Sequence, residues 1–175
     1  KSTADVINLK EDMISFNDVL GMPDLTYGWA KLTCEYLGKI AWERYGIKSV
    51  AYRPFSGYGP DQDLTYPFPS ICKRAVEMKS NETFTVWGSG LQSRDFIHID
   101  DVVNYHLSFL RKNVSGTFNI GSGSTLSFLE IAQHVAKKHF CDIRYIPMPE
   151  DLKSSYQKFT CADMSKTKSV DDQKS

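Results

Sequence analysis

Residues 25–45 carry the pattern that most restricts the fold of this chain. Apolar side chains recur there at the spacing of an amphipathic helix, namely Trp29, Leu32, Tyr36, Leu37, Ile40 and Ala41. Gly46 is typical of a residue that ends a helix in a left-handed conformation. Residues 48–52 then read as a short strand. A helix followed so closely by a strand indicates a β-α-β unit, and therefore an α/β fold with parallel strands.

Tyr27 and Lys31 lie four positions apart on this predicted helix. Residues at that spacing share one helix face, about one turn apart. An ammonium group beside a phenol favours the phenolate, so the pair is suited to general acid–base catalysis. The spacing alone is weak evidence, because a chain with nine tyrosines is expected to contain about one such pair by chance. The alternative is ordinary solvated helix surface.

The composition indicates a globular protein and argues against several classes of partner. Apolar residues make up 41% of the 175 and the formal net charge is zero, so neither nucleic acid nor a membrane is expected. No apolar stretch reaches the length of a membrane span. Cys34, Cys72, Cys141 and Cys161 are widely spaced. We therefore expect reduced, mostly buried thiols in a cytoplasmic protein, without a disulfide or zinc site.

Other elements follow from residue alternation and capping signals. We expect strands at 3–7, 83–87, 95–99, 117–120 and 143–146, and a helix at 68–78. Asp100 is expected to cap the helix that follows it. Ser127 and Glu130 predict a capping box that opens a helix ending near His139. Residues 8–24, 57–66 and 148–175 are expected to be loops or irregular segments.

Four separated segments carry a family resemblance, at residues 2–6, 26–31, 53–60 and 86–103. In this order and spacing they resemble the extended short-chain dehydrogenase/reductase family, specifically its sugar-nucleotide epimerases and dehydratases. The resemblance extends from Ser2 to about Lys168. It implies part of a Rossmann-type parallel sheet plus a smaller α/β substrate-binding domain. The first would comprise residues 1–53 and 95–118, and the second residues 54–94 and 119–175.

The resemblance also implies catalytic roles. Thr3, Tyr27 and Lys31 match the hydroxyl residue and the Y-x-x-x-K pair that act on the substrate hydroxyl being oxidised, and the lysine also holds the nicotinamide ribose. For Thr3 the alternative is a local backbone cap. Asp5 stands where family dehydratases carry a catalytic Glu and some epimerases a Cys, the alternative being a solvated loop residue. Ala4 interrupts the acidic pair usual in dehydratases, which favours an epimerase.

The loop that follows the predicted strand at 48–52 resembles the family pattern R-P-x-N-x-Y-G-P. Pro54, Phe55 and Ser56 would therefore lie beneath the nicotinamide. Ser56 replaces the Asn that touches the sugar nucleotide in the family, so a shorter hydroxyl or a bridging water would serve. The alternative is that this Gly/Pro segment only forms a turn.

Substrate binding is implied for Arg94 and Trp87. Arg94 matches the arginine that clamps the substrate diphosphate, for which a planar guanidinium is well suited. The alternative is a surface pair between Arg94 and Asp95. Trp87 is either a core residue or a wall on which the base stacks. A terminal D-x-S-K occurs at 163–166, but the R-x-x-D that usually precedes it is missing. We expect no metal at His98 and its neighbouring aspartates.

The sequence contains no strand followed by the glycine-rich turn with which family members normally begin. We therefore expect this chain to be the C-terminal portion of a longer protein, or a sequence whose first half is missing. The resemblance implies NAD, or NADP, as cofactor, a nucleotide-diphosphate sugar as substrate, and a homodimer formed through the helix that starts near Tyr27. The predicted function is NAD-dependent epimerisation through a transient keto sugar. A 4,6-dehydratase, or a truncated chain that binds sugar nucleotides without catalysis, is the alternative.

Overall fold

The computed structural model describes residues 8–14, 25–79, 82–150 and 156–171 and confirms an α/β fold. In chain order its elements are β1 (Asn8–Leu9), α1 (Leu25–Tyr45), β2 (Val50–Pro54), β3 (Ser56–Tyr58), α2 (Pro67–Glu77), β4 (Phe84–Trp87), β5 (Ser93–Arg94), β6 (Phe96–His98), α3 (Ile99–Arg111), β7 (Gly116–Ile120), β8 (Leu126–Ser127), α4 (Phe128–His139), β9 (Ile143–Ile146), β10 (Phe159–Ala162) and α6 (Ser165–Asp171). The predicted strand at 3–7 lies outside the described residues.

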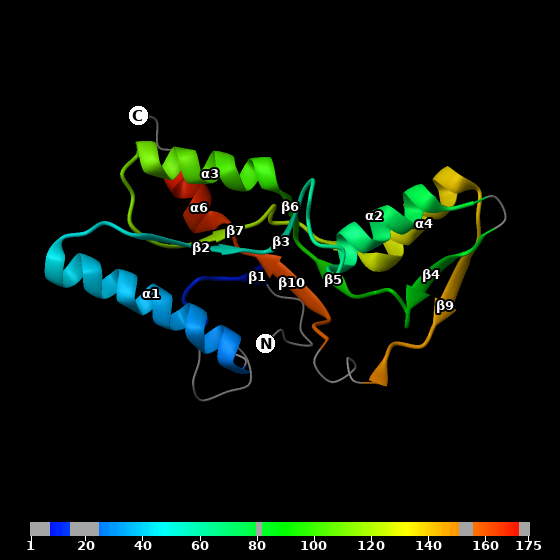
Figure 1. The fold of residues 1–175 in the computed structure, drawn as a ribbon. Coiled ribbons are helices and arrows are strands. Elements are labelled where there is room, and N and C mark those ends of the chain that lie inside the picture. Colours follow the sequence, from blue (N-terminus) through cyan, green and yellow to red (C-terminus); the bar gives the residue numbers. More distant parts are fainter. Residues whose placement is uncertain (1–7, 15–24, 80–81, 151–155, 172–175) are drawn as a thin grey trace.

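One group of elements is built on the parallel pair of β2 and β7, in which Val50 lies opposite Gly116 and Pro54 opposite Ile120. Helix α1 lies on one side of this pair, and α3 and α6 lie on the other (Figure 1). The α3 side is packed, with the buried rings of Phe109 and Phe118 4.7 Å apart. On α1, in contrast, none of residues 26–45 is buried.

A second group is built on the parallel pair of β4 and β9, with α2 and α4 beside it (Figure 1). Its core consists of apolar side chains from these elements: Ile71, Phe84, Val86, Ala132 and Val135. The capping box that opens α4 is confirmed, because Ser127 Oγ accepts from the Glu130 N–H at 3.1 Å while the Glu130 carboxylate accepts from the Ser127 N–H at 2.7 Å.

Short strands connect the two groups. β3 pairs in parallel with β6, and a four-stranded sheet runs in the order β1-β10-β5-β8. β5 is antiparallel to β8 and parallel to β10. The parallel strands β2 and β7 end together at Pro54 and Ile120, and ligand sites of α/β folds are usually found at such carboxyl ends.

The predicted end of the first helix is confirmed. Gly46 has φ +66°, and its N–H donates to the Trp42 carbonyl at 3.0 Å, while the Ile47 N–H donates to the Ala41 carbonyl at 3.1 Å. A left-handed residue of this kind lets the chain turn back and pair the last helix carbonyls.

Several local predictions are wrong. Helix α3 begins two residues earlier than expected, so His98 is the capping residue and its Nδ1 accepts from the Asp100 N–H at 3.3 Å. The expected loops contain β1, β3, β10 and α6. Each of these strands pairs with a segment distant in the sequence, so no local residue pattern predicts the strand. The cysteines are less buried than predicted, because Cys34 and Cys72 are exposed.

The two-part division of the chain stays a prediction. Strand β10 and helix α6 lie in the predicted substrate-binding part, residues 54–94 and 119–175. They nevertheless contact elements of the other predicted part, because β10 pairs with β1, and α6 contacts α3 and β7. None of the helices in the described ranges combines the length and apolar character needed to cross a membrane.

Candidate active site

Five of the predicted site residues line one cavity of about 480 Å³, which we call the Tyr27 cavity. They are Tyr27, Pro54, Phe55, Ser56 and Arg94, and the other lining residues are Leu9, Lys10, Met13, Ile14, Arg53, Asn119, Gln157 and Thr160. The cavity lies where β2 and β7 end, since Arg53 is paired with Asn119 in that sheet. Arg53 belongs to the motif segment 53–60, whereas the other additional residues were not anticipated, because their proximity arises from pairing between distant segments.

Tyr27 and Lys31 are neighbours on α1, as their spacing predicts. The Lys31 Nζ lies 5.4 Å from the centroid of the Tyr27 ring. The Tyr27 side chain is 71% exposed, so its hydroxyl is accessible to a ligand. Tyr27 lines the cavity, whereas Lys31 is not among the lining residues. The pair therefore presents a phenol to the cavity with a cation beside it.

The position of α1 relative to the sheet depends on Arg53. Its Nε and Nη2 donate to the two carboxylate oxygens of Glu35 at 2.7 and 2.6 Å. Its Nη1 donates to the Glu11 carbonyl at 2.7 Å, and the Glu11 carboxylate accepts from the Asn119 N–H at 2.9 Å. Paired bonds of a guanidinium with a carboxylate are among the strongest and most directional in proteins. Arg53 therefore joins α1, the segment after β1, and the edge of the Tyr27 cavity.

Replacing Glu35 by glutamine should lower the free energy of unfolding by about 2 kcal/mol, less than for a fully buried pair because both partners remain partly exposed. The side chains of Arg53 and Glu35 are 25% and 18% exposed. Glu43→Gln is the matched control on the same helix, because its pair with Lys39 is 51% and 67% exposed. That control should cost less than about 0.5 kcal/mol. Urea unfolding measures the free energy of unfolding of both variants. Equal losses for Glu35→Gln and Glu43→Gln would contradict the assigned role of Arg53.

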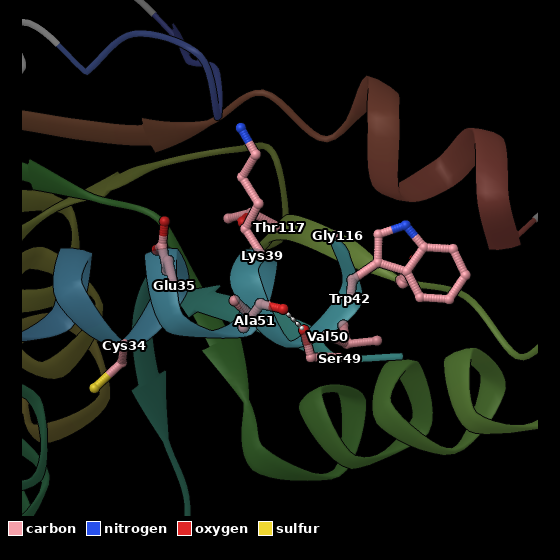
Figure 2. A pocket seen from close by; sticks show the side chains of 11 residues that line it. Cys34, Glu35, Lys39, Trp42, Ser49, Val50, Ala51, Gly116 and Thr117 are labelled. Carbon is pink, nitrogen blue, oxygen red and sulfur yellow. Dashed lines mark hydrogen bonds between the residues drawn. The ribbon is translucent and has the colours of Figure 1, made fainter. Parts of the chain in front are cut away.

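A second contact between α1 and the sheet borders a smaller cavity of about 270 Å³ (Figure 2). Side chains of α1, including Cys34, Lys39 and Trp42, line one side of it, and β2 and β7 line the other (Figure 2). The Ser49 Oγ donates to the Gly38 carbonyl at 3.0 Å. A Cβ at Gly38 would lie 2.8 Å from the Ser49 Oγ, so the glycine allows α1 to lie this close to Ser49. Neither Tyr27 nor Lys31, the two predicted catalytic residues within the described ranges, lines this cavity.

The loop from Pro54 to Ser56 is held by its backbone. The Phe55 N–H donates to the Ile120 carbonyl at 2.9 Å, and the Ser56 N–H donates to the Asp95 carbonyl at 2.9 Å. The loop is therefore attached to β7 on one side and to the β5–β6 connection on the other. This attachment places Ser56 in the wall of the Tyr27 cavity.

Arg94 forms no ion pair with any carboxylate in the part of the chain that the structure describes. Its Nη1 donates to the Ser93 carbonyl at 2.8 Å, and its guanidinium lies against the rings of Tyr156 and Phe128. Burial lowers the pKa of Arg94, although the nearby Tyr156 acts in the opposite direction. The guanidinium still carries its charge, since its ordinary pKa lies about five units or more above neutrality. The Tyr27 cavity therefore contains a cation available to an anionic ligand.

The alternative of an Arg94–Asp95 surface pair is wrong, because Asp95 is completely buried. Its carboxylate accepts from the Ser122 N–H and Oγ at 2.7 Å each, from the Gly123 N–H at 3.1 Å and from the Ala162 N–H at 3.0 Å. Successive residues of an extended segment point to opposite sides, so Arg94 and Asp95 face different neighbours. Sequence reasoning missed Asp95 as a structural residue, because its donors lie far along the chain.

Trp87 does not lie in the Tyr27 cavity. It is 43% exposed and lines a separate cavity of about 520 Å³, the Trp87 cavity, together with Arg74, Gln92, Phe128 and Tyr156, among others. The core alternative for Trp87 is therefore wrong. Its possible role as a wall for a base stays a prediction.

Two predicted catalytic residues, Thr3 and Asp5, lie outside the described residues. Within the described ranges, no group of three His, Cys, Asp or Glu side chains is arranged to hold a metal ion. Asp163, in the terminal D-x-S-K, accepts from the Ser165 N–H at 2.9 Å, and hydrogen bonding to the side chain and then the backbone of Ser165 lowers the pKa of Asp163. Asp163 therefore caps the start of α6.

Comparison with known proteins shows the family and the fold of the chain. Residues 8–121 match the model of the NAD dependent epimerase/dehydratase family. The chain is 36% identical over 140 residues to the ADP-L-glycero-D-manno-heptose-6-epimerase of Brachyspira hyodysenteriae, which covers 77% of this chain and 44% of that protein. Among solved structures, the UDP-glucuronic acid 4-epimerase of Bacillus cereus has 29% identity and a TM-score of 0.73, covering 94% of this chain and 50% of that one.

The dTDP-glucose 4,6-dehydratase of Bacillus anthracis, solved with NAD, has a TM-score of 0.75 at 20% identity, which shows a shared fold. That match covers 97% of this chain and 51% of the dehydratase. The chain thus spans about half the length of the relatives it matches. The family match covers more than half of this chain, and the resemblance expected from the four sequence segments is confirmed. The chain belongs to the NAD dependent epimerase/dehydratase family.

Proposed function

We propose that the protein containing this chain catalyses the NAD-dependent epimerisation of a nucleotide-diphosphate sugar through a transient keto sugar. One observation carries the proposal: a phenol, a hydroxyl and a guanidinium, from Tyr27, Ser56 and Arg94, line the same cavity, and the guanidinium has no ion pair among the described residues. These groups suit proton transfer at a sugar hydroxyl and recognition of a diphosphate. Family membership and two relatives named as epimerases of nucleotide sugars support the same reaction class.

The described residues fit the nicotinamide end of a dinucleotide. Tyr27 is exposed on α1 with the Lys31 ammonium beside it, and the backbone of 54–56 is held in place opposite. Bound NAD would accept a hydride from the sugar carbon and later return it. The glycine-rich turn that would hold the adenosine end is not contained in this sequence. NADP would be held at its nicotinamide end in the same way.

In the proposed reaction, Tyr27 takes the proton of the sugar hydroxyl while the C–H bond of the same carbon is broken. Lys31 stabilises the phenolate by its charge and holds the nicotinamide ribose. The resulting ketone acidifies the adjacent C–H, so an acid–base group can invert that carbon, or the keto sugar can turn over before reduction. We propose Thr3 as a second contact to the reacting hydroxyl and Asp5 as the second acid–base group.

Arg94 would bind the diphosphate of the substrate. Ser56 would contact either the sugar or the nicotinamide ribose. Two parallel hydrogen bonds from a guanidinium to phosphate oxygens fix both position and orientation. We further propose a cytoplasmic homodimer formed through α1. Exposed apolar residues on that helix, among them Trp29, Tyr36 and Leu37, support the interface. The two-part division of the chain at residues 53, 95 and 118 belongs to the same proposal.

The test is product analysis with the complete protein. One sample is denatured, and the nicotinamide that it releases is measured in the supernatant. Native protein is then incubated with NAD and with ADP-, UDP- or dTDP-linked sugars. An epimerase yields an isomer of equal mass, seen as new anomeric and ring signals in the NMR spectrum. A product lighter by one water would instead identify a dehydratase. If no sugar nucleotide is converted by NAD-loaded protein, the proposal is wrong.

A further inference from the structure

The Arg94 guanidinium contacts two neighbouring aromatic rings. Its central carbon is 5.1 Å from the centroid of the Tyr156 ring and 5.9 Å from that of the Phe128 ring. The two ring centroids are 6.5 Å apart. A cation within about 6 Å of a ring centroid is attracted by the electron density of the ring face. Phe128 begins α4 and Tyr156 precedes β10, so the two rings approach Arg94 from different elements.

These ring contacts compensate for burial of the charge. A buried cation is unfavourable unless other groups replace its water. Here only the Ser93 carbonyl accepts from the guanidinium, and Arg94 makes no ion pair among the residues that the structure describes. Burial also raises the pKa of Tyr156, although the charge of Arg94 opposes that rise. The phenol is therefore neutral near pH 7 and leaves the charge of Arg94 unneutralised.

The two rings also indicate which cavity the Arg94 guanidinium faces. Arg94 lines the Tyr27 cavity, whereas Phe128 and Tyr156 line the Trp87 cavity. The Arg94 group with its two rings thus forms the boundary between the cavities. The rings contact the guanidinium from the Trp87 side, so its remaining N–H groups are available on the Tyr27 side.

We propose that Tyr156 is a positioning residue whose ring, and not its hydroxyl, holds Arg94 in the orientation that binds the diphosphate of a nucleotide sugar. The inference rests on the proposed function, because it needs a diphosphate ligand at Arg94. It assigns Tyr156 no direct contact with that ligand.

The test measures dissociation constants by calorimetry on the complete protein, with ADP, UDP and dTDP and the three corresponding nucleosides as probes. Arg94→Ala should weaken diphosphate binding about 30-fold, as expected for loss of charge-assisted hydrogen bonds. Tyr156→Leu should weaken it about tenfold, whereas Tyr156→Phe, which keeps the ring, should stay within about twofold. Nucleoside binding should change in none of these variants. Tyr156→Leu should add no further loss in the Arg94→Ala background.

Tyr145→Leu is the matched control, because it removes an exposed ring from β9 that lines neither cavity. Thermal unfolding verifies the fold of each variant, and Tyr156→Met replaces Tyr156→Leu if the latter does not fold. The positioning role is refuted if diphosphate binding survives loss of the ring, if Tyr156→Phe is as weak as Tyr156→Leu, or if nucleoside binding falls equally. If the parent protein binds none of the three diphosphates, the proposed function itself is wrong, and this inference with it.

Discussion

Replacing Tyr27 by phenylalanine should lower kcat about 1,000-fold, within the range by which a positioned acid–base group accelerates reactions. The substitution removes one oxygen and leaves the ring, its contact with the Lys31 ammonium and the shape of the cavity. The sugar hydroxyl would then have no phenolate to take its proton when the C–H bond breaks. The measurement is steady-state turnover of the sugar nucleotide identified by product analysis, on NAD-loaded complete protein.

The loss should appear in kcat and much less in KM, because the proposed substrate contacts of Arg94 and Ser56 would be unchanged. Tyr45→Phe is the matched control, since Tyr45 is an equally exposed tyrosine at the other end of α1 and lines no described cavity. It should turn over as fast as the parent. A Tyr27→Phe protein with undiminished turnover would remove the basis of the proposed mechanism.

Replacing Asp95 by alanine should lower the free energy of unfolding by about 4 kcal/mol, because each buried donor left without an acceptor costs about 1–3 kcal/mol. The carboxylate is the shared acceptor for Ser122, Gly123 and Ala162, which belong to the turn after β7 and to β10. Its loss would leave the buried N–H of Ala162 without an acceptor, and would remove the acceptor of the Gly123 N–H and of the exposed Ser122. It would also separate β5, β7 and β10, which all border the Tyr27 cavity.

Urea unfolding provides the measurement, with the midpoint and slope analysed together. Asp142→Ala is the control, because this aspartate is exposed and its loss should change stability by less than about 0.5 kcal/mol. Gly121→Ala tests the packing around Asp95, since an added Cβ would lie 2.6 Å from the Asp95 Oδ2 and 2.8 Å from the Ala162 Cβ. If Asp95→Ala is no more costly than Asp142→Ala, the assignment of Asp95 as a structural centre is wrong.

Short-range patterns determined much of this protein from its sequence. Helical spacing predicted α1 and placed Tyr27 beside Lys31, and the capping box at Ser127 predicted the start of α4. Such features depend on residues a few positions apart, and local backbone geometry then decides the result. The order of the four motif segments indicated the family, and the family match confirms it.

Strand pairing was less predictable because its partners are distant in the sequence. β3 and β10 were expected to be irregular, yet each is ordered by a neighbour far along the chain. The same limit applies to Trp87, for which burial in the core was one of two alternatives. Its exposure depends on how α2 and α4 pack beside β4, which no single segment encodes.

The amino-acid sequence alone indicated which chemical groups the proposed site contains: a phenol beside an ammonium, a Pro–Phe–Ser loop and an arginine. Only the tertiary structure decided how they are held. Arg53 binds Glu35 across 18 positions, and Asp95 binds Ala162 across 67. Hydrogen bonds and ion pairs act over a few ångströms of space, not along the chain, so their partners become defined only after the strands have paired.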